Sequence, residues 1–95
     1  MELYKLSQVA KEDLIRIHQY GVKKFGETQA DKYFHQFFKH FERIAANPYQ
    51  FPSAHHIRKG YRTCVCGVDT IYYRITDTVV EIMAIIGQQD IENNI

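Results

Sequence analysis

The spacing of apolar residues changes once along this chain, near Asn47 and Pro48, and this change constrains the fold more than any other feature. Before that point, apolar residues recur every three or four positions, as they do on one face of a helix. After it, short runs rich in β-branched and aromatic residues follow one another, as in strands. A helical first half followed by several strands predicts an α+β fold.

Gly26 divides the helical half into two predicted helices. The first is expected to follow a cap at Ser7 and to end near Phe25, and the second to begin at a cap on Thr28. Because only two residues separate them, we expect an antiparallel helical hairpin. The apolar faces consist of Ala10, Leu14, Ile17, Gly21 and Phe25 in the first helix, and of Ala30, Tyr33, Phe34, Phe37, Phe41, Ile44 and Ala45 in the second.

Four segments have the composition of strands. One precedes the helices and three follow a connecting loop, so the predicted order is β-α-α-β-β-β, with the helical hairpin packed on a small, mainly antiparallel sheet. The loop covers residues 49–59, and the strands are predicted at Glu2–Leu6, Tyr61–Cys66, Thr70–Thr76 and Val79–Ile86.

The last two strands suggest their own register. A two-residue turn at positions 77–78 makes charge oppose charge and apolar side chains oppose apolar ones, which favours that pairing over its alternatives. The pairs it predicts are Arg74 with Glu81, Tyr73 with Ile82, and Tyr72 with Met83.

The preceding hairpin is expected to have a three-residue turn at 67–69, which sets Arg62 opposite Arg74 and aligns both with Glu81. The face predicted to pack on the helices then holds Val65, Ile71, Tyr73, Ile75, Val80, Ile82, Ala84 and Ile86. The other face holds Arg62, Cys64, Cys66, Tyr72, Arg74, Glu81, Met83 and Ile85. An exposed face so rich in apolar residues predicts a protein partner.

Length and charge narrow the possible functions. The 95 residues allow one domain, residues 1–95. The first residues lack the pattern of a secretory signal and no apolar run is long enough to span a bilayer, so we expect a cytoplasmic protein with no membrane partner. The net charge of +1 argues against direct, sequence-specific binding to nucleic acid.

Metal and nucleophile chemistry find little support in the sequence. His35 and His40 are five positions apart, so they point about 140° apart on a helix and cannot easily share one ion. The Cys64-x-Cys66 pair matches no common zinc spacing. We therefore predict neither a metal site nor any other cofactor, and no catalytic residue is assigned.

One catalytic alternative remains open, a metal-free site that cleaves phosphodiesters. Lys59, Arg62, Tyr72 and Arg74 could stabilise phosphate charge and move protons. Glu81 opposes Arg74 in the predicted register and would neutralise part of that field. The other interpretation of Arg74 is an ordinary cross-strand ion pair.

A series of short motifs in a fixed order resembles the ParE-type toxins of the RelE/ParE superfamily. The resemblance covers about Tyr4 to Ile91. Its motifs are Ala10-x-x-Asp13-Leu14-x-x-Ile17-x-x-Tyr20, Phe25-Gly26-x-x-Gln29-Ala30-x-x-Tyr33, Asn47-Pro48, Arg58-x-Gly60-Tyr61-Arg62, Gly67, Ile71-Tyr72-Tyr73-Arg74 and Ile85-Ile86-x-Gln88-Gln89-Asp90.

This resemblance implies the toxin of a type II toxin–antitoxin pair, a class associated with plasmid stabilisation. Its expected partners are a cognate antitoxin and DNA gyrase, whereas RelE-like relatives cleave mRNA on the ribosome. No Tyr, His, Lys or Arg follows Arg74, which favours the ParE-like function. Three positions, Asp69, Gly87 and Gln89, depart from the family pattern by lacking cationic side chains. The predicted partner-binding residues are Arg58, Tyr61, Arg62, Tyr72, Arg74 and Met83.

Overall fold

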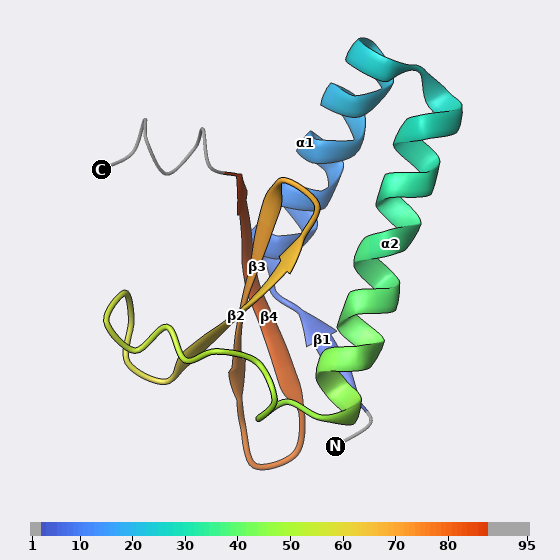
Figure 1. Cartoon of the computed structure of the whole chain (residues 1–95). Coiled ribbons are helices and arrows are strands. Elements are labelled where there is room, and N and C mark those ends of the chain that lie inside the picture. Colours follow the sequence, from blue (N-terminus) through green and yellow to red (C-terminus); the bar gives the residue numbers. More distant parts are fainter. Residues whose placement is uncertain (1–2, 88–95) are drawn as a thin grey trace.

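A computed structural model describes residues 3–87 of the chain (Figure 1). Two helices and a four-stranded sheet follow one another in the predicted order, which confirms the α+β, β-α-α-β-β-β fold. The elements are β1 (Tyr4–Leu6), α1 (Gln8–Phe25), α2 (Glu27–Ala46), β2 (Tyr61–Cys66), β3 (Asp69–Ile75) and β4 (Val80–Gly87).

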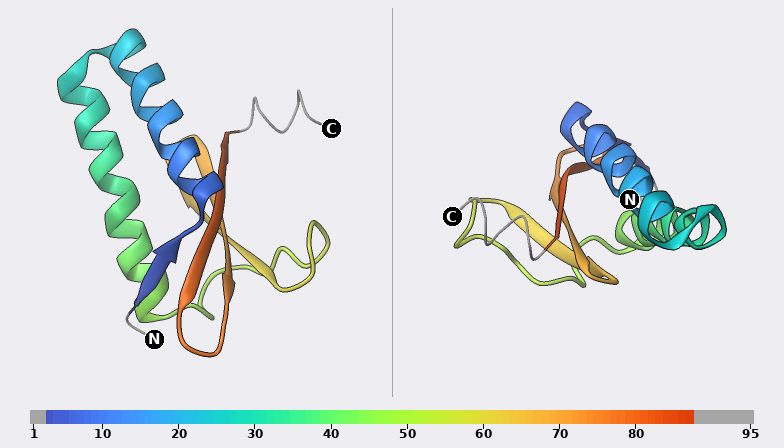
Figure 2. Two further views of the ribbon diagram at one scale, coloured as in Figure 1. Left: turned by 180° about the vertical axis from the view of Figure 1, so that it is seen from behind. Right: turned by 90° about the horizontal axis from the view of Figure 1, so that it is seen from above.

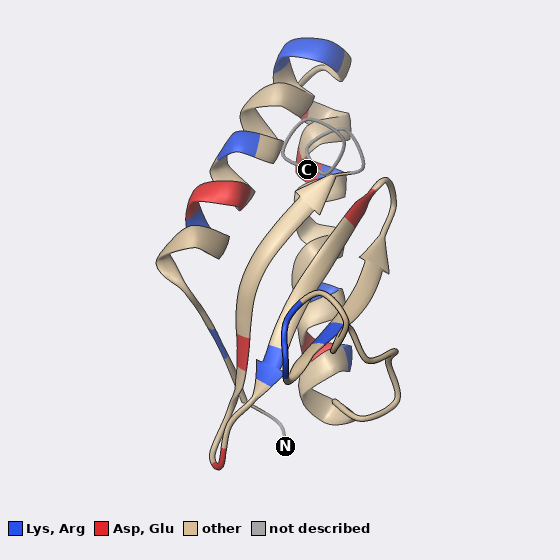
Figure 3. Ribbon diagram, turned by 90° about the vertical axis from the view of Figure 1, so that its left-hand side faces the viewer, with Lys and Arg blue, Asp and Glu red and all other residues tan. Residues whose placement is uncertain are grey.

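The sheet has the strand order β1-β4-β3-β2, in which β1 runs parallel to β4 and the other neighbours are antiparallel. The helical hairpin lies against one side of the sheet (Figure 2). We call that side the covered face. The other side, which neither α1 nor α2 covers, is the open face and is turned toward the viewer in Figure 3.

The hydrophobic core lies between the hairpin and the covered face. Phe37 and Phe41 of α2 and Tyr73 and Ile82 of the central strands are fully buried. The Tyr73 hydroxyl donates a 2.5 Å hydrogen bond to the carbonyl of Pro48, just beyond the end of α2. This buried bond ties the chain that leaves α2 to the middle of the sheet.

The two helix starts differ in how they are capped. Ser7 caps α1 as predicted, because its Oγ accepts a hydrogen bond from the Ala10 amide at 3.0 Å. The predicted cap on Thr28 is wrong. α2 begins at Glu27 with Gly26 at its N-cap, at a φ of +89° that glycine adopts easily. One glycine therefore ends α1 and precedes α2, which makes the hairpin tighter than expected.

The pairing of β3 with β4 is confirmed in its first half. Residues 77–78 form the turn, and Arg74 pairs with Glu81 and Tyr73 with Ile82. A β-bulge between Tyr72 and Tyr73 then shifts the register, so Tyr72 opposes Ala84 instead of Met83. Because one extra residue reverses the alternation, Ile85 is buried in the core in place of the predicted Ala84 and Ile86.

The predicted register of β2 against β3 is wrong by one residue. The turn is only Gly67–Val68 and Asp69 already belongs to β3, so Tyr61 pairs with Arg74 and Arg62 with Tyr73. All of β2 therefore presents the opposite face to the one expected. The thiol-bearing residues Cys64 and Cys66 are buried, whereas Val65 is 66% exposed.

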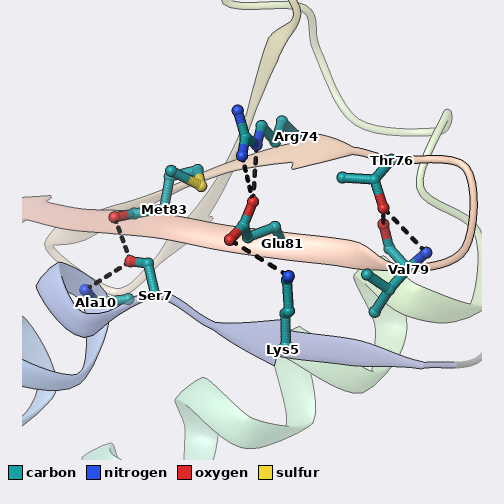
Figure 4. Close-up of polar contacts among 8 residues, drawn as sticks. All are labelled: Lys5, Ser7, Ala10, Arg74, Thr76, Val79, Glu81 and Met83. Atoms are coloured by element: carbon teal, nitrogen blue, oxygen red, sulfur yellow. Dashed lines mark hydrogen bonds and ion pairs between the residues drawn. The ribbon is translucent and has the colours of Figure 1, made fainter.

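β1 is shorter than β4, so part of one edge of β4 has no neighbouring strand. Polar side chains of α1 and of its cap form hydrogen bonds with the backbone groups of β4 along that edge. Ser7 Oγ donates to the Met83 carbonyl at 2.8 Å, at the bulge (Figure 4). Asp13 Oδ2 accepts from the Ile85 amide at 2.9 Å, and Arg16 Nη2 donates to the Ile85 carbonyl at 3.4 Å. These bonds take the place of a longer neighbouring strand and explain why Asp13 belongs to the motif of α1.

Candidate functional site

A row of polar and aromatic residues crosses all four strands of the sheet on the open face. The strand registers place Lys5 beside Glu81, Glu81 beside Arg74, and Arg74 beside Tyr61. Each strand contributes one residue, so the sheet itself fixes the order of the row. We call Lys5, Glu81, Arg74 and Tyr61 the cross-strand row.

Glu81 is the centre of this row (Figure 4). Its Oε1 accepts from Arg74 Nε at 2.8 Å and lies 2.6 Å from Arg74 Nη2, while its Oε2 lies 3.8 Å from Lys5 Nζ. The Glu81 side chain is 14% exposed, against 49% for Arg74 and 61% for Lys5. One largely buried carboxylate thus holds two cations that still reach solvent.

The structure brings five of the six predicted partner-binding residues to this region. The guanidinium of Arg58 lies over the Tyr61 ring, 5.7 Å from its centroid. Tyr72 pairs with Thr63 and Ala84 on the open face and is largely buried, although it does not belong to the core cluster. Met83 lies at the bulge, on the same side of β4 as the Arg74–Glu81 pair (Figure 4).

Arg62 is the exception among the six. The predicted row of Arg62, Arg74 and Glu81 is wrong because β2 is shifted by one residue, which puts Arg62 on the covered face. Its Nη1 donates to the Phe51 carbonyl at 2.7 Å, and its guanidinium lies 5.2 Å from the Tyr49 ring centroid. Arg62 therefore holds the loop that joins α2 to β2, and its role toward a partner stays a prediction.

A groove of about 960 Å³ lies between the closed end of the helical hairpin and the tip of the β2–β3 hairpin. Three large apolar side chains on its wall are more than half exposed, Tyr20, Phe25 and Val68. Lys24 lies over the Tyr20 and Phe25 rings, 5.5 and 5.7 Å from their centroids. This groove was not predicted from the sequence, because Phe25 was expected on a buried helix face and Val68 in an ordinary turn.

A partly buried polar cluster joins the β2–β3 turn to α2 beside this groove. The Tyr33 hydroxyl lies 2.7 Å from both the Cys66 carbonyl and Asp69 Oδ2. Burial and the bond to Asp69 together raise the pKa of Tyr33 far above its usual range, so the phenol stays protonated. A Cβ added to Gly67 would lie only 2.6 Å from the Tyr33 ring, which shows how closely the turn approaches the helix.

The two cysteines, Cys64 and Cys66, belong to the buried core and not to the open face. Burial raises the pKa of both cysteines, that of Cys66 to about 11, so their thiols stay protonated and poorly nucleophilic at neutral pH. Within residues 3–87 no three His, Cys, Asp or Glu side chains gather where a metal ion could bind. No helix in that part of the chain is long and apolar enough to cross a membrane.

Known proteins resemble this chain in sequence over most of its length. Residues 4–92 match the family model described as the ParE toxin of the type II toxin–antitoxin system parDE. A relative called Toxin ParE1 from Caulobacter vibrioides is 34% identical over 88 residues, which cover 93% of this chain and 91% of the relative. Toxin ParE1 of Mycobacterium tuberculosis is 30% identical over 94 residues, covering 97% and 96% of the two chains.

A solved structure shows the same fold. It is described as the chromosomal ParDE TA system from P. aeruginosa, and it superposes on this chain with a TM-score of 0.81. The match covers 92% of this chain and 96% of the other at 19% sequence identity. At that identity the likeness concerns the arrangement of helices and strands.

Proposed function

This chain belongs to the family of ParE toxins of type II toxin–antitoxin systems, and from that premise we propose that it acts in the cytoplasm by binding DNA gyrase and is silenced by a cognate antitoxin. The family match supports the roles of toxin and antitoxin. The chemistry of the open face supports action by binding.

The observation that carries this proposal is that the arginines of the open face already contact other side chains. Arg74 is paired with Glu81, and Arg58 lies on an aromatic ring. A phosphodiester-cleaving site needs cations directed at the phosphate and a group that moves protons. Arginine and tyrosine side chains that lie side by side are instead typical of the residues that dominate the energy of protein interfaces.

We assign the target-binding surface to the cross-strand row with Arg58, Tyr72 and Met83. Its cations are about half exposed and its aromatic rings are held by neighbouring strands, so little side-chain freedom is lost on binding. Lys5 joins the residues predicted from the sequence, because only the parallel pairing of β1 with β4 places it beside Glu81.

We assign the antitoxin to the groove at the closed end of the hairpin. Its apolar wall, with Tyr20, Phe25 and Val68 exposed, fits the apolar face of an amphipathic segment. Lys23 and Lys24 in the last turn of α1 favour a segment that carries acidic residues beside its apolar ones. An antitoxin bound in the groove would cover apolar surface that is exposed to water in the free protein.

The alternative is a ribosome-dependent mRNA endonuclease of the RelE type. One observation favours it, the presence of Tyr72 and Arg74 on the same face with Arg58 nearby. It requires Arg74 to leave Glu81 and a proton-transfer group to come within reach of the RNA. The cross-strand row itself contains no histidine.

The deciding experiment pairs a gyrase supercoiling assay with an in vitro translation reaction probed for cut mRNA. We expect the purified protein to inhibit supercoiling while the mRNA stays intact. Cut mRNA with normal supercoiling would transfer the protein to the RelE-type function.

Two exposed valines offer a matched test of the two surfaces. Val68 lies at the groove and Val65 on the open face, 81% and 66% exposed. We expect Val68→Asp to weaken antitoxin binding by about tenfold or more, because it puts a charge into the apolar contact. A tenfold loss corresponds to about 1.4 kcal/mol. The same variant should leave gyrase inhibition unchanged. Val65→Asp should leave antitoxin binding unchanged. Equal loss of antitoxin binding in both variants would contradict the assignment of the groove.

A further inference from the structure

Glu81 is the only acidic side chain among the described strand residues of the open face. It lies between Lys5 and Arg74, and Arg58 follows beyond Tyr61. Without this carboxylate, three cations would line one side of a small sheet. Such a group of cations beside tyrosine rings attracts nucleic acid through its phosphates and bases.

We propose that Glu81 is a specificity-determining residue that keeps the open face from binding RNA. The proposal rests on the function proposed above, in which this face recognises a protein. Glu81 achieves this by occupying the hydrogen-bonding edge of Arg74 and by neutralising part of the charge of the row.

The geometry supports an active role for the carboxylate. Arg74 directs both Nε and Nη2 at Glu81 Oε1, at 2.8 and 2.6 Å, and this is the edge that a guanidinium uses to bind a phosphate. An RNA phosphate would have to displace a carboxylate that is already in place. It would also meet the negative charge of Glu81 at short range.

Burial makes Glu81 hard to move aside. Its side chain is 14% exposed, while the cations on either side are more than three times as exposed. The pairing of Glu81 with Lys5 and with Arg74 is set by backbone register on both sides. The carboxylate therefore cannot swing into solvent as a surface glutamate on a helix can.

A protein partner does not face the same barrier. It can stack apolar and aromatic groups on Tyr61 and Met83 and leave the Arg74–Glu81 pair intact, because this mode of binding needs no displacement of the carboxylate. A short RNA draws most of its affinity from its phosphates. Glu81 thus has little effect on the binding of a protein and a large effect on the binding of RNA.

The test is binding of a fluorescently labelled single-stranded RNA, measured by anisotropy at several salt concentrations. Glu81→Gln keeps the shape and the acceptor oxygen but removes the charge. We expect this variant to bind the RNA about tenfold more tightly than the natural sequence at low salt. The slope of log K against log salt should steepen by about 0.7 for each additional phosphate that the variant neutralises.

Glu12→Gln is the matched control, because it makes the same change in net charge on the exposed surface of α1. We expect it to bind RNA as weakly as the natural sequence. The double variant Glu81→Gln/Arg74→Gln should lose the added affinity, since the arginine that would bind the phosphate is absent. If circular dichroism shows that Glu81→Gln is unfolded, Glu81→Thr replaces it, because threonine suits a strand and carries no charge.

The inference is overturned if Glu81→Gln, folded, binds RNA no better than Glu12→Gln, or if the double variant keeps the added affinity. A natural sequence that already binds the RNA as tightly as Glu81→Gln would overturn it as well. The supercoiling assay tests the proposed function separately. A protein that inhibits gyrase while its Glu81→Gln variant binds RNA no more tightly would keep that function and lose this inference.

Discussion

The two faces of the sheet are built from alternating residues of the same strands, yet they differ in how their polar groups are held. On the covered face, Tyr73 reaches across the core to a backbone carbonyl, and Asp69 is bonded to Tyr33 of α2. On the open face, the carboxylate of Glu81 meets side chains of its neighbouring strands, and these still reach solvent. The covered face should therefore determine stability and the open face recognition.

The largest expected loss of stability comes from truncating a buried side chain of the covered face. Ile82→Ala removes a fully buried side chain between the central strands and the helices and should cost about 2–5 kcal/mol of the free energy of unfolding. Urea denaturation followed by circular dichroism measures it. A loss below about 1 kcal/mol, the range of a surface change, would contradict the contrast between the faces.

A second test concerns the β2–β3 turn. Gly67→Ala introduces a Cβ that would lie 2.6 Å from the Tyr33 ring, at a φ of +61°, and we expect a destabilisation of about 1–3 kcal/mol. Gly60→Ala is the matched control, because its φ of +84° is also positive but no atom of residues 3–87, apart from its chain neighbours, lies within 4 Å of the added Cβ. Equal losses in thermal unfolding would mean that the approach of Tyr33 has no effect.

The third test addresses the polar edge of β4. Asp13→Ala leaves the Ile85 amide without its acceptor and should cost about 1–3 kcal/mol. Asp13→Asn keeps an oxygen at that position and should cost less. Hydrogen exchange at the Ile85 amide provides the local measurement, and unchanged protection in Asp13→Ala would contradict this role.

The covered face also predicts an alkaline loss of stability. Burial raises the pKa of Tyr73 from 10.0 to about 12, against the opposing charge of Arg62, and burial raises that of Cys66 from 9.0 to about 11. Because both pKa values are higher in the folded state, their contribution is complete below about pH 9 and is lost as the pH rises toward about 12.

Denaturation midpoints measured from pH 8 upward test this dependence. Tyr73→Phe should be less stable at pH 8, since the Pro48 carbonyl loses its donor, but should lose less stability as the pH rises. A parallel decline in both proteins would assign the alkaline transition to other groups.

The smallest expected effect on stability lies on the open face. Arg74→Ala removes a half-exposed arginine but leaves the carboxylate of Glu81 with Lys5 as its remaining cation, so it should change the free energy of unfolding by about 1 kcal/mol, the upper end of the range for exposed pairs. The same variant should weaken gyrase inhibition by tenfold or more. A variant that unfolds readily but inhibits normally when folded would reverse the assignment of the two faces.

The fold and part of the site could be predicted because their signals are local. Helical spacing, the cap at Ser7 and the two-residue turn at 77–78 depend on residues close together in sequence, and charge pairing then fixed Arg74 opposite Glu81. Five of the six predicted binding residues came together around that pair. The cap on Thr28 failed because Gly26 serves both helices.

The sequence alone thus determined the order of the elements, the helical hairpin and the Arg74–Glu81 pair, because each is encoded by neighbours or by a strong alternation. Only the tertiary structure decided the register of β2, since Arg62, Cys64 and Cys66 alternate with Tyr61, Thr63 and Val65 and neither set is clearly the more apolar. Packing against α2 through Tyr33 resolves that choice. The bulge, the place of Lys5 and the groove likewise depend on contacts between segments far apart in the chain.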